Sequence, residues 1–400
     1  MKRNLSLMYA IALLQGMVFY GPVATLYRQA HGLSLFQITL LESVSLALCI
    51  LLEVPWGAAA DRIGYKKAMV FCCCLYFISK LLFWQADGFG GFLAERVVLS
   101  VVLAGLSGLD ESILFLSCPP GESQRVFGLY TSLQTLGLLA AALVFSLWIG
   151  ERYALAGLLT ALSYGVAALL SFGLAEVKPS EPYRQPGAFR QAAGQVLKNR
   201  RLMVLLVAAG LLTESHQVVT VFLNQPQYQR CGMGDRAIGL AYLAATLLGL
   251  TGAYSFRLTR TLGERRTARL LFALSALSCL TLALTRSAAL SVAGLLLFRV
   301  GNSLFQPLQL ELQNREISTA DRATALSVGA MVMDVVGVGA NLAFGAVADR
   351  SLSAALLLGG GLCAAGLLLF RAGSRTGGGR AKRGRLCDGS THSRPERKDG

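Results

Sequence analysis

Charged residues are scarce in this chain: Asp, Glu, Lys and Arg make up only 15% of its 400 residues, whereas 54% are hydrophobic. A water-soluble domain of this length needs far more charge on its surface, so the shortage excludes an ordinary soluble protein. The net charge of +15 would fit a nucleic-acid-binding protein, but the charges lie in loops between apolar runs. We therefore expect a multi-spanning membrane protein that does not bind nucleic acid.

Several chemical signatures are also missing. The nine cysteines mostly lie inside apolar runs and show neither a CxxC pattern nor a Cys/His spacing suited to a metal. No glycine-rich loop of the Walker type occurs, so direct use of ATP is unsupported. The first apolar run, about 5–27, is longer than a signal-peptide core and lacks a small-x-small cleavage site. We expect a retained membrane helix there, and neither a metal nor another cofactor.

Twelve runs are long and apolar enough to cross a membrane, and they must be helical because lipid offers no partners for backbone polar groups. They lie at about 5–27, 36–56, 68–86, 92–114, 127–149, 153–174, 202–223, 237–257, 267–285, 289–311, 323–345 and 353–371. We predict an all-α membrane protein with one six-helix bundle at 1–174 and a second at 202–371. A proline-containing cytoplasmic linker at 175–201, with an interfacial helix at 188–198, joins them, and a basic tail at 372–400 is predicted to be disordered.

The basic residues predict the orientation. The loops on the side of the termini hold most of the Lys and Arg, whereas the opposite loops hold only Arg28, Arg152, Arg230, Arg236, Arg286 and Arg350. Because cytoplasmic loops are enriched in Lys and Arg, we expect both termini in the cytoplasm. The protein is then a multi-pass protein of a cell membrane, of the bacterial inner-membrane type, and we expect it to be a monomer in the lipid bilayer.

Short motifs recur about 200 residues apart. The pairs are Gly32 and Ile38 with Gly232 and Ile238, residues 62–67 with residues 261–266, and Arg96 and Ser100 with Arg299 and Ser303. Two six-helix halves related by an axis along the membrane normal would place a substrate site between them, near the midplane.

The run from Gly57 to Lys67 resembles the loop signature of the major facilitator superfamily, Gly-x-x-x-Asp-Arg-x-Gly-x-(Lys/Arg), between its second and third helices. The matching residues are Gly57, Asp61, Arg62, Gly64, Lys66 and Lys67. The resemblance extends over residues 1–371 and implies two pseudo-symmetric six-helix bundles. It also implies a gate in which Asp61 docks on the start of helix eleven, where Ser318 or Thr319 could provide the cap. Tyr65 departs from the family, which usually has a base there, so a charge relay through it is in doubt.

Ionisable residues inside the predicted spans are functional candidates, because each costs about 3 kcal/mol at the bilayer centre. The candidates for proton or substrate binding are, in order, Asp334, Glu214, Asp110, Glu111 and Glu42, with Arg299 as a partner for Glu214 or Asp334. An apolar environment favours the protonated form of a carboxyl group and a nearby cation opposes it, so the unpaired acid is the better proton carrier. The competing interpretation is structural ion pairs, which we favour for Glu53 and Arg96, and we expect His216 to be an interior residue.

These features favour a secondary transporter that moves a small molecule by alternating access, driven by protons. Export of a drug or metabolite is the favoured direction, and proton-coupled uptake of a nutrient is the alternative. The Gly-Pro signature of one drug–proton antiporter type is missing from residues 128–150, which argues against that type. Two other classes are a membrane-embedded enzyme using Asp110 and Glu111 as acid and base, and a receptor-like protein. Because no histidine lies near those two acids in the sequence, we predict that the protein is not an enzyme.

Overall fold

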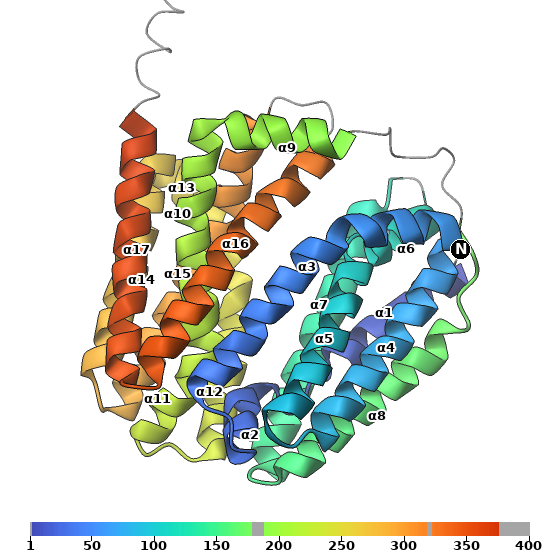
Figure 1. The fold of residues 1–400 in the computed structure, drawn as a ribbon, viewed down its shortest axis with the longest axis horizontal. Helices are drawn as coiled ribbons and strands as arrows, with labels where there is room; N and C mark the ends of the chain where they lie inside the picture. The colour runs from blue at the N-terminus through green and yellow to red at the C-terminus, as the bar shows by residue number, and fades with distance from the viewer. Residues whose placement is uncertain (1, 120, 178–187, 318–321, 376–400) are drawn as a thin grey trace, which may run out of the picture.

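The computed structural model describes residues 2–119, 121–177, 188–317 and 322–375, and within them it is helical throughout, with twelve candidate membrane spans. The first six spans are α1 (Lys2–Gly16) with η1 (Gly21–Val23) and α2 (Ala24–Ala30), α3 (Leu35–Ile63), α4 (Tyr65–Gln85), α5 (Gly88–Leu106) with α6 (Leu109–Ser117), α7 (Ser123–Val144) with η2 (Phe145–Ile149), and α8 (Tyr153–Ser171). They form one bundle, so the predicted fold class is confirmed for this half (Figure 1).

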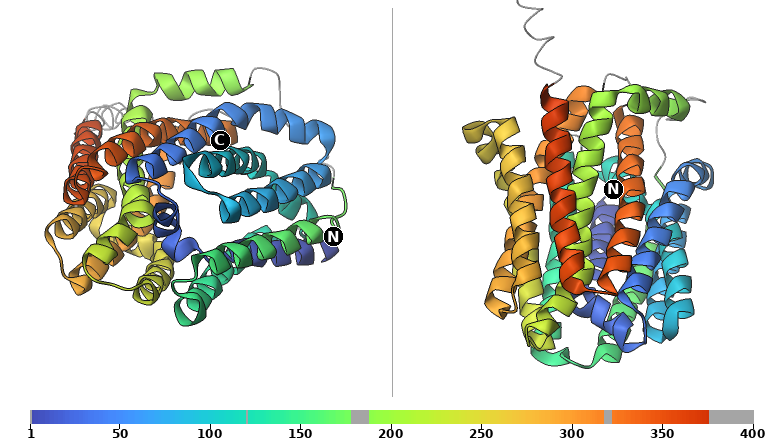
Figure 2. Two further views of the ribbon diagram at one scale, coloured as in Figure 1. Left: turned by 60° about the horizontal axis from the view of Figure 1, so that its bottom comes forward. Right: turned by 60° about the vertical axis from the view of Figure 1, so that its left-hand side comes forward.

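The second bundle follows α9 (Ala188–Lys198), which matches the short helix predicted at 188–198. Its six spans are α10 (Arg200–Gln217) with η3 (Val218–Leu223) and α11 (Asn224–Arg230), α12 (Asp235–Leu248) with η4 (Gly249–Tyr254) and α13 (Ser255–Leu262), α14 (Glu264–Leu284), α15 (Ala288–Glu316), α16 (Arg322–Ala348), and α17 (Leu352–Arg375). We call the end of the molecule that carries α9 the α9 end, and the opposite end the α11 end (Figures 1 and 2).

The first predicted span is not one continuous helix. The chain leaves α1 at Gly16 and turns before Pro22, which has no backbone N–H to donate to a helix. The amide of Phe19, released by this break, donates to the hydroxyl of Thr160 at 2.9 Å. A side chain from another span thus satisfies the interrupted backbone, as a low-dielectric environment requires.

The fourth predicted span is interrupted in a similar way. Gly108, with φ +75°, separates α5 from α6 because its backbone adopts the left-handed conformation. The hydroxyl of Ser112 then donates to the Gly108 carbonyl at 2.6 Å. Apolar length alone predicted the span, but not the turn inside it.

The link between the second and third spans is shorter than the sequence suggested. Helix α3 continues to Ile63 and α4 begins at Tyr65, so Gly64 alone joins them. The backbones of Gly57, Asp61 and Arg62 are therefore helical rather than part of a loop. Gly64 makes this possible through a φ of +93°.

The internal repeat is visible in the backbone. Gly64 and Gly263 have φ of +93° and +79° and nearly equal ψ of 147° and 148°, and each directly precedes a long helix. Gly32 and Gly232 match as well, with φ of +84° and +77°. These paired turns agree with the two pseudo-symmetric bundles predicted from the repeated motifs.

The two halves meet mainly along two helix pairs, α3 with α16 and α7 with α12. The ribbons of the bundles draw together at the α11 end and stand farther apart at the α9 end (Figure 1). At the α11 end Gln225 accepts from the amides of Thr25 and Leu26, at 2.8 and 3.2 Å. These two bonds satisfy donors at the start of α2, which a helix leaves without intrahelical partners.

Within the first half, α1 and α7 approach backbone to backbone. A Cβ added to Gly137 would overlap the carbonyl oxygen of Leu13, and one added to Gly16 would overlap that of Gln134. In lipid such small residues allow close packing of helices.

We expect Gly137→Ala to destabilise the protein by about 1–3 kcal/mol, because the methyl group must push α1 and α7 apart. The matched control is Gly128→Ala in the same helix, where nothing lies within 4 Å of the added Cβ. The midpoint of thermal unfolding in detergent should fall for the first variant and not for the second. Equal midpoints for both would contradict the close α1–α7 contact.

Candidate functional site

Four carboxylates from both halves gather around the contact between α3 and α16. Glu42 and Glu53 come from α3, Glu214 from α10 and Asp334 from α16. The charges of Asp334 and Glu42 act on Glu214, and those of Glu53 and Glu42 act on Asp334. The structure therefore brings together three of the acids predicted for the site, Asp334, Glu214 and Glu42, and adds Glu53 to them.

Glu42 is the acid of this group that has a cationic partner. Its carboxylate lies 3.0 Å from a guanidinium nitrogen of Arg96 on α5. Both side chains are nearly buried, with exposed fractions of 15% and 11%. The structural ion pair expected for Arg96 is thus present, and it neutralises Glu42, the last-ranked acid.

Glu214 lies at the junction of three helices. A Cβ added to Gly337 of α16 would come within 2.7 Å of its carboxylate and 2.9 Å of Leu46 on α3. Glu214 is only 9% exposed, and its carboxylate has no ion pair or hydrogen bond with any described residue. A buried carboxylate without a partner is costly in its charged form, so this site favours a proton on Glu214.

Asp334 is half-buried and likewise has no ion pair within the described part of the chain. About two helical turns further along α16, the amide group of Asn341, which is fully buried, donates to the carbonyl of Gly337. Asp334 therefore differs from Glu214 in being more accessible. Both acids belong to helices of the second bundle, and α16 is the one that packs against α3 of the first.

Arg299 pairs with neither acid, so the predicted partnership is wrong. Its guanidinium lies against η4, where a Cβ on Gly249 would come within 2.9 Å of it. Its Nε is buried without a hydrogen-bond partner. The missing side chain at Gly249 leaves room on the α12 side of α15, and Arg299 occupies that room instead of reaching α10 or α16.

His216 is an interior residue, as predicted, with 3% of its surface exposed. Its Nδ1 lies 3.2 Å from the amide nitrogen of Asn302, and its ring meets Phe298 edge to face. Its Nε2 has no partner among the described residues. His216 thus belongs to the packing of α10 against α15 and not to the acid group.

The first half contains a buried lysine, Lys80, surrounded by tyrosines, which the sequence analysis did not rank among the candidates. Lys80 on α4 is 5% exposed, donates to the hydroxyl of Tyr20 at 3.1 Å, and lies 5.0 and 5.4 Å from the ring centres of Tyr76 and Tyr164. The rings stabilise the ammonium through cation–π attraction. A charged residue in the middle of an apolar span is the sequence signal that could have identified it.

Asp110 and Glu111 lie apart from the acid group, at the start of α6. Asp110 accepts from the hydroxyl of Tyr130 at 3.0 Å and from the amide of Glu111 at 2.9 Å. Glu111 is exposed. The hydrogen bonds of Asp110 fasten the beginning of a short helix, where a carboxylate also interacts favourably with the helix dipole.

The glycine signature near the α9 end is only partly described. The amide of Lys66 donates to Glu176 at 3.2 Å, and the same carboxylate lies against Gly64. Arg62 and Lys67 are exposed. The side chain of Asp61, and residues 318–321 with the predicted caps Ser318 and Thr319, lie outside the described residues, as do the surroundings of Gly57.

An unpredicted carboxylate joins the halves at the α11 end. Asp349, directly after α16, accepts from the amide of Phe36 in the first turn of α3 at 2.9 Å. A residue of one bundle thus caps a helix of the other. The tripeptide Ala348-Asp349-Arg350 resembles the Ala-Asp-Arg part of the glycine signature and is the sequence signal for this residue.

A further hydrogen bond between the halves lies nearer the α9 end. Glu53 accepts from the hydroxyl of Ser327 at 2.8 Å, and Ser107 lies 3.5 Å from the same oxygen. Glu53, for which the sequence favoured a structural role, therefore joins α3 to α16. Within the described residues no group of three or more His, Cys, Asp and Glu side chains could hold a metal ion.

Comparison with known proteins supports this architecture. A model of the Major Facilitator Superfamily matches residues 5–341. The structure of the nucleoside transporter NupG is 15% identical and has a TM-score of 0.80, with 92% of this chain and 99% of that chain covered.

Two further solved structures are similar in fold. The POT family transporter PepTSo is 13% identical with a TM-score of 0.76, over 94% of this chain and 98% of that chain. A D-xylose–proton symporter is 14% identical with a TM-score of 0.70, over 92% and 97%. Because the family model covers most of the sequence and twelve spans form two bundles, the chain belongs to the Major Facilitator Superfamily and is a multi-pass membrane transporter.

Proposed function

We propose that this protein is a proton-coupled secondary transporter that moves a small molecule between its two bundles by alternating access. The observation that carries the proposal is the pair Asp334 and Glu214, which lie beside the contact between the halves without a cationic partner in the described residues. Neither carboxylate is held in the charged form by a neighbouring base. Each can therefore take up and release a proton as its surroundings change.

The position of these acids couples protonation to movement. Glu214 lies against Gly337, and Leu46 of α3 lies against the same glycine, so the carboxylate is close to the contact between the two bundles. Charged Asp334 is repelled by Glu53 across the α3–α16 contact and also repels Glu214, and adding a proton removes part of that repulsion. Protonation then favours closer approach of α3, α10 and α16, and deprotonation favours their separation.

Two gates at opposite ends fit this proposal. Asp349 caps the start of α3 at the α11 end in the state seen here. By analogy with the family's signature, Asp61 would dock on the start of α16 at the α9 end when the bundles rock the other way. Since the sequence predicts a cytoplasmic α9 end, we interpret the structure as an inward-facing state of a cell-membrane protein with both termini inside.

The direction of transport rests on the family resemblance. Export of a drug or metabolite remains the favoured hypothesis, and uptake of a nutrient is the alternative. The D-xylose–proton symporter among the similar folds is an example of proton coupling in this architecture.

An enzyme is disfavoured because Asp110 accepts a hydrogen bond from Tyr130 and the hydroxyl of Ser112 donates to the Gly108 carbonyl at the start of its own helix. In proteoliposomes, unchanged solute accumulating selects transport, product formation selects an enzyme, and neither selects a receptor.

We expect Asp334→Asn and Glu214→Gln each to abolish solute movement driven by a pH gradient, because neither amide can carry a proton. A screen for compounds that move protons across inverted vesicles supplies the substrate. Exchange of that substrate at equal pH on both sides should continue, since it needs rocking of the bundles but no net proton transfer.

The matched control is Glu122→Gln, which removes an exposed carboxylate near Arg125 at the rim. This variant should retain pH-driven transport. If Asp334→Asn and Glu214→Gln both transport as the unmodified protein does under the same gradient, these acids do not couple protons to transport.

We expect Asp349→Ala to destabilise the state seen here by about 1 kcal/mol, because the first turn of α3 loses the cap supplied by the other bundle and keeps only that of Ser34. Spin labels at the exposed positions Asp87 and Arg286, at the α11 ends of the two halves, should report a larger population of long distances. Arg350→Ala changes the neighbouring exposed residue and should leave the distances as they are. An unchanged distribution in Asp349→Ala would argue against an outer gate at this residue.

A further inference from the structure

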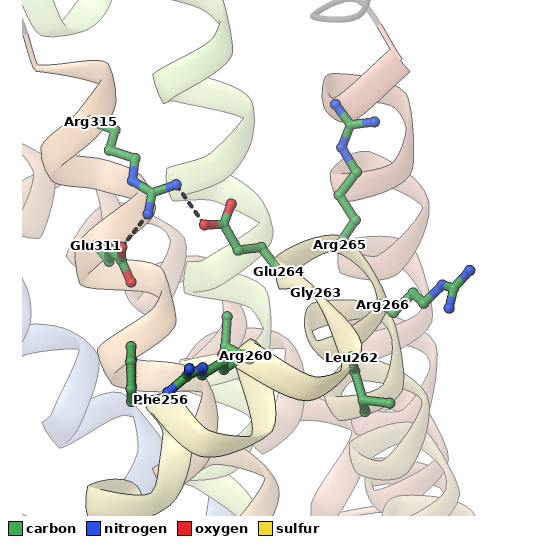
Figure 3. A pocket seen from close by; sticks show the side chains of 10 residues that line it. Phe256, Arg260, Leu262, Gly263, Glu264, Arg265, Arg266, Glu311 and Arg315 are labelled. Atoms are coloured by element: carbon green, nitrogen blue, oxygen red, sulfur yellow. Dashed lines mark hydrogen bonds and ion pairs between the residues drawn. The ribbon is translucent and has the colours of Figure 1, made fainter.

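A cleft at the α9 end lies outside the transport site. It has a volume of about 600 Å³ and surrounds the turn between α13 and α14, next to the last turns of α15. Figure 3 shows Arg315 between Glu311 and Glu264, Arg260 beside Phe256, and Arg265 and Arg266 beyond Gly263. The lining thus combines basic side chains with apolar ones.

The acids of the cleft are already neutralised. Arg315 forms ion pairs with both Glu264, at 2.6 Å, and Glu311. Arg260, Arg265 and Arg266 are exposed and have no carboxylate partner among the described residues. The lining of the cleft therefore carries an excess of positive charge.

The apolar side chains that line the cleft are exposed at the surface of the protein. Phe256 is 70% exposed and Leu262 is 39% exposed, although both belong to the helical segment that completes the eighth span. Beside them Arg257 lies 5.4 Å from the ring centre of Tyr254, which is 57% exposed. Aromatic and aliphatic side chains next to arginines at the end of a span are typical of the membrane interface.

The repeat shows what the corresponding turn of the first half holds. There the carboxylate of Glu176 lies against Gly64 and accepts from the amide of Lys66. Around Gly263, which has the same backbone conformation, a Cβ would find nothing within 4 Å. In the repeat register Arg260 stands where the first half has Asp61. The second turn therefore has neither the acid of the signature nor, among the described residues, a carboxylate packed against its glycine, as Glu176 is against Gly64.

We propose that this cleft binds the phosphate group of an anionic phospholipid from the leaflet at the α9 end. Arg260, Arg265 and Arg266 neutralise the phosphate, and Phe256 and Leu262 contact the acyl chains beside it. Arginine suits this role because its guanidinium can donate two hydrogen bonds to one phosphate. A free phosphate shares the chemistry of the head group but gains nothing from the apolar residues, which is why the structure favours the lipid.

The test titrates the full-length protein in detergent with dioleoyl phosphatidylglycerol, and separately with dioleoyl phosphatidylcholine, and counts bound lipid by native mass spectrometry. Phosphatidylglycerol should bind more tightly. Arg260→Gln/Arg265→Gln should weaken the binding of phosphatidylglycerol about thirtyfold, because each arginine near an anionic head group contributes about fivefold to the affinity. The control Arg286→Gln/Arg350→Gln removes equal charge at the α11 end and should bind as the parent does. Arg260→Lys/Arg265→Lys keeps the charge but loses the paired hydrogen bonds, so its affinity should lie between those of the parent and of the Gln double variant.

Equal affinity for the two lipids, or equal loss in the two Gln double variants, would overturn the proposal. Competition by millimolar inorganic phosphate or glycerol phosphate would show a site for free phosphate and overturn the lipid assignment. If Arg260→Gln/Arg265→Gln is not monodisperse, the single variant Arg260→Gln replaces it, with an expected loss of about fivefold. Loss of phosphatidylglycerol preference in that variant alone supports the cleft, and its retention refutes it.

Discussion

The antiparallel contact between α3 and α16 is the constraint on which the rest of the structure depends. These two helices belong to different bundles, yet each begins near the other's end, so any change between the halves must alter their contact. Hydrogen bonds join them at several levels: Asp349 with Phe36, Ser43 with the Val338 carbonyl, and Glu53 with Ser327. The acid group lies along the same contact. Conformation and charge are therefore controlled at one place.

The two halves treat buried charge differently. In the first half the cations are surrounded by aromatic rings, with Lys80 among tyrosines and Arg28 over Phe83, and Arg96 is paired with Glu42. In the second half Glu214 and Asp334 are left without such compensation among the described residues. These three cations of the first half therefore have stabilising partners inside their own bundle. The two acids without a cationic partner belong to α10 and α16 of the other bundle.

Much of the fold could be predicted from the sequence, because apolar length sets the number of spans and the repeated glycines set the pairing of turns. The interruptions at Gly16–Pro22 and Gly108 could not be predicted as easily. They depend on partners distant in the sequence, such as Thr160 for the amide of Phe19. The candidate site likewise has parts that local sequence predicts and parts that depend on residues distant in the sequence. Intramembrane acids on α10 and α16 were recognisable by composition, whereas the place of Arg299 depended on a gap at Gly249, and the cap by Asp349 depended on the relative placement of two bundles.

The single-residue joint at Gly64 has a mechanical consequence. With no slack between α3 and α4, a tilt of α3 against α16 is handed directly to α4, which carries Lys80 into the interior of its bundle. Glu176, a few residues after the end of α8, accepts from the amide of Lys66 at the same joint, so the chain just beyond α8 is joined to the start of α4. We therefore expect α3, α4 and the end of α8 to change position together when the contact between α3 and α16 changes.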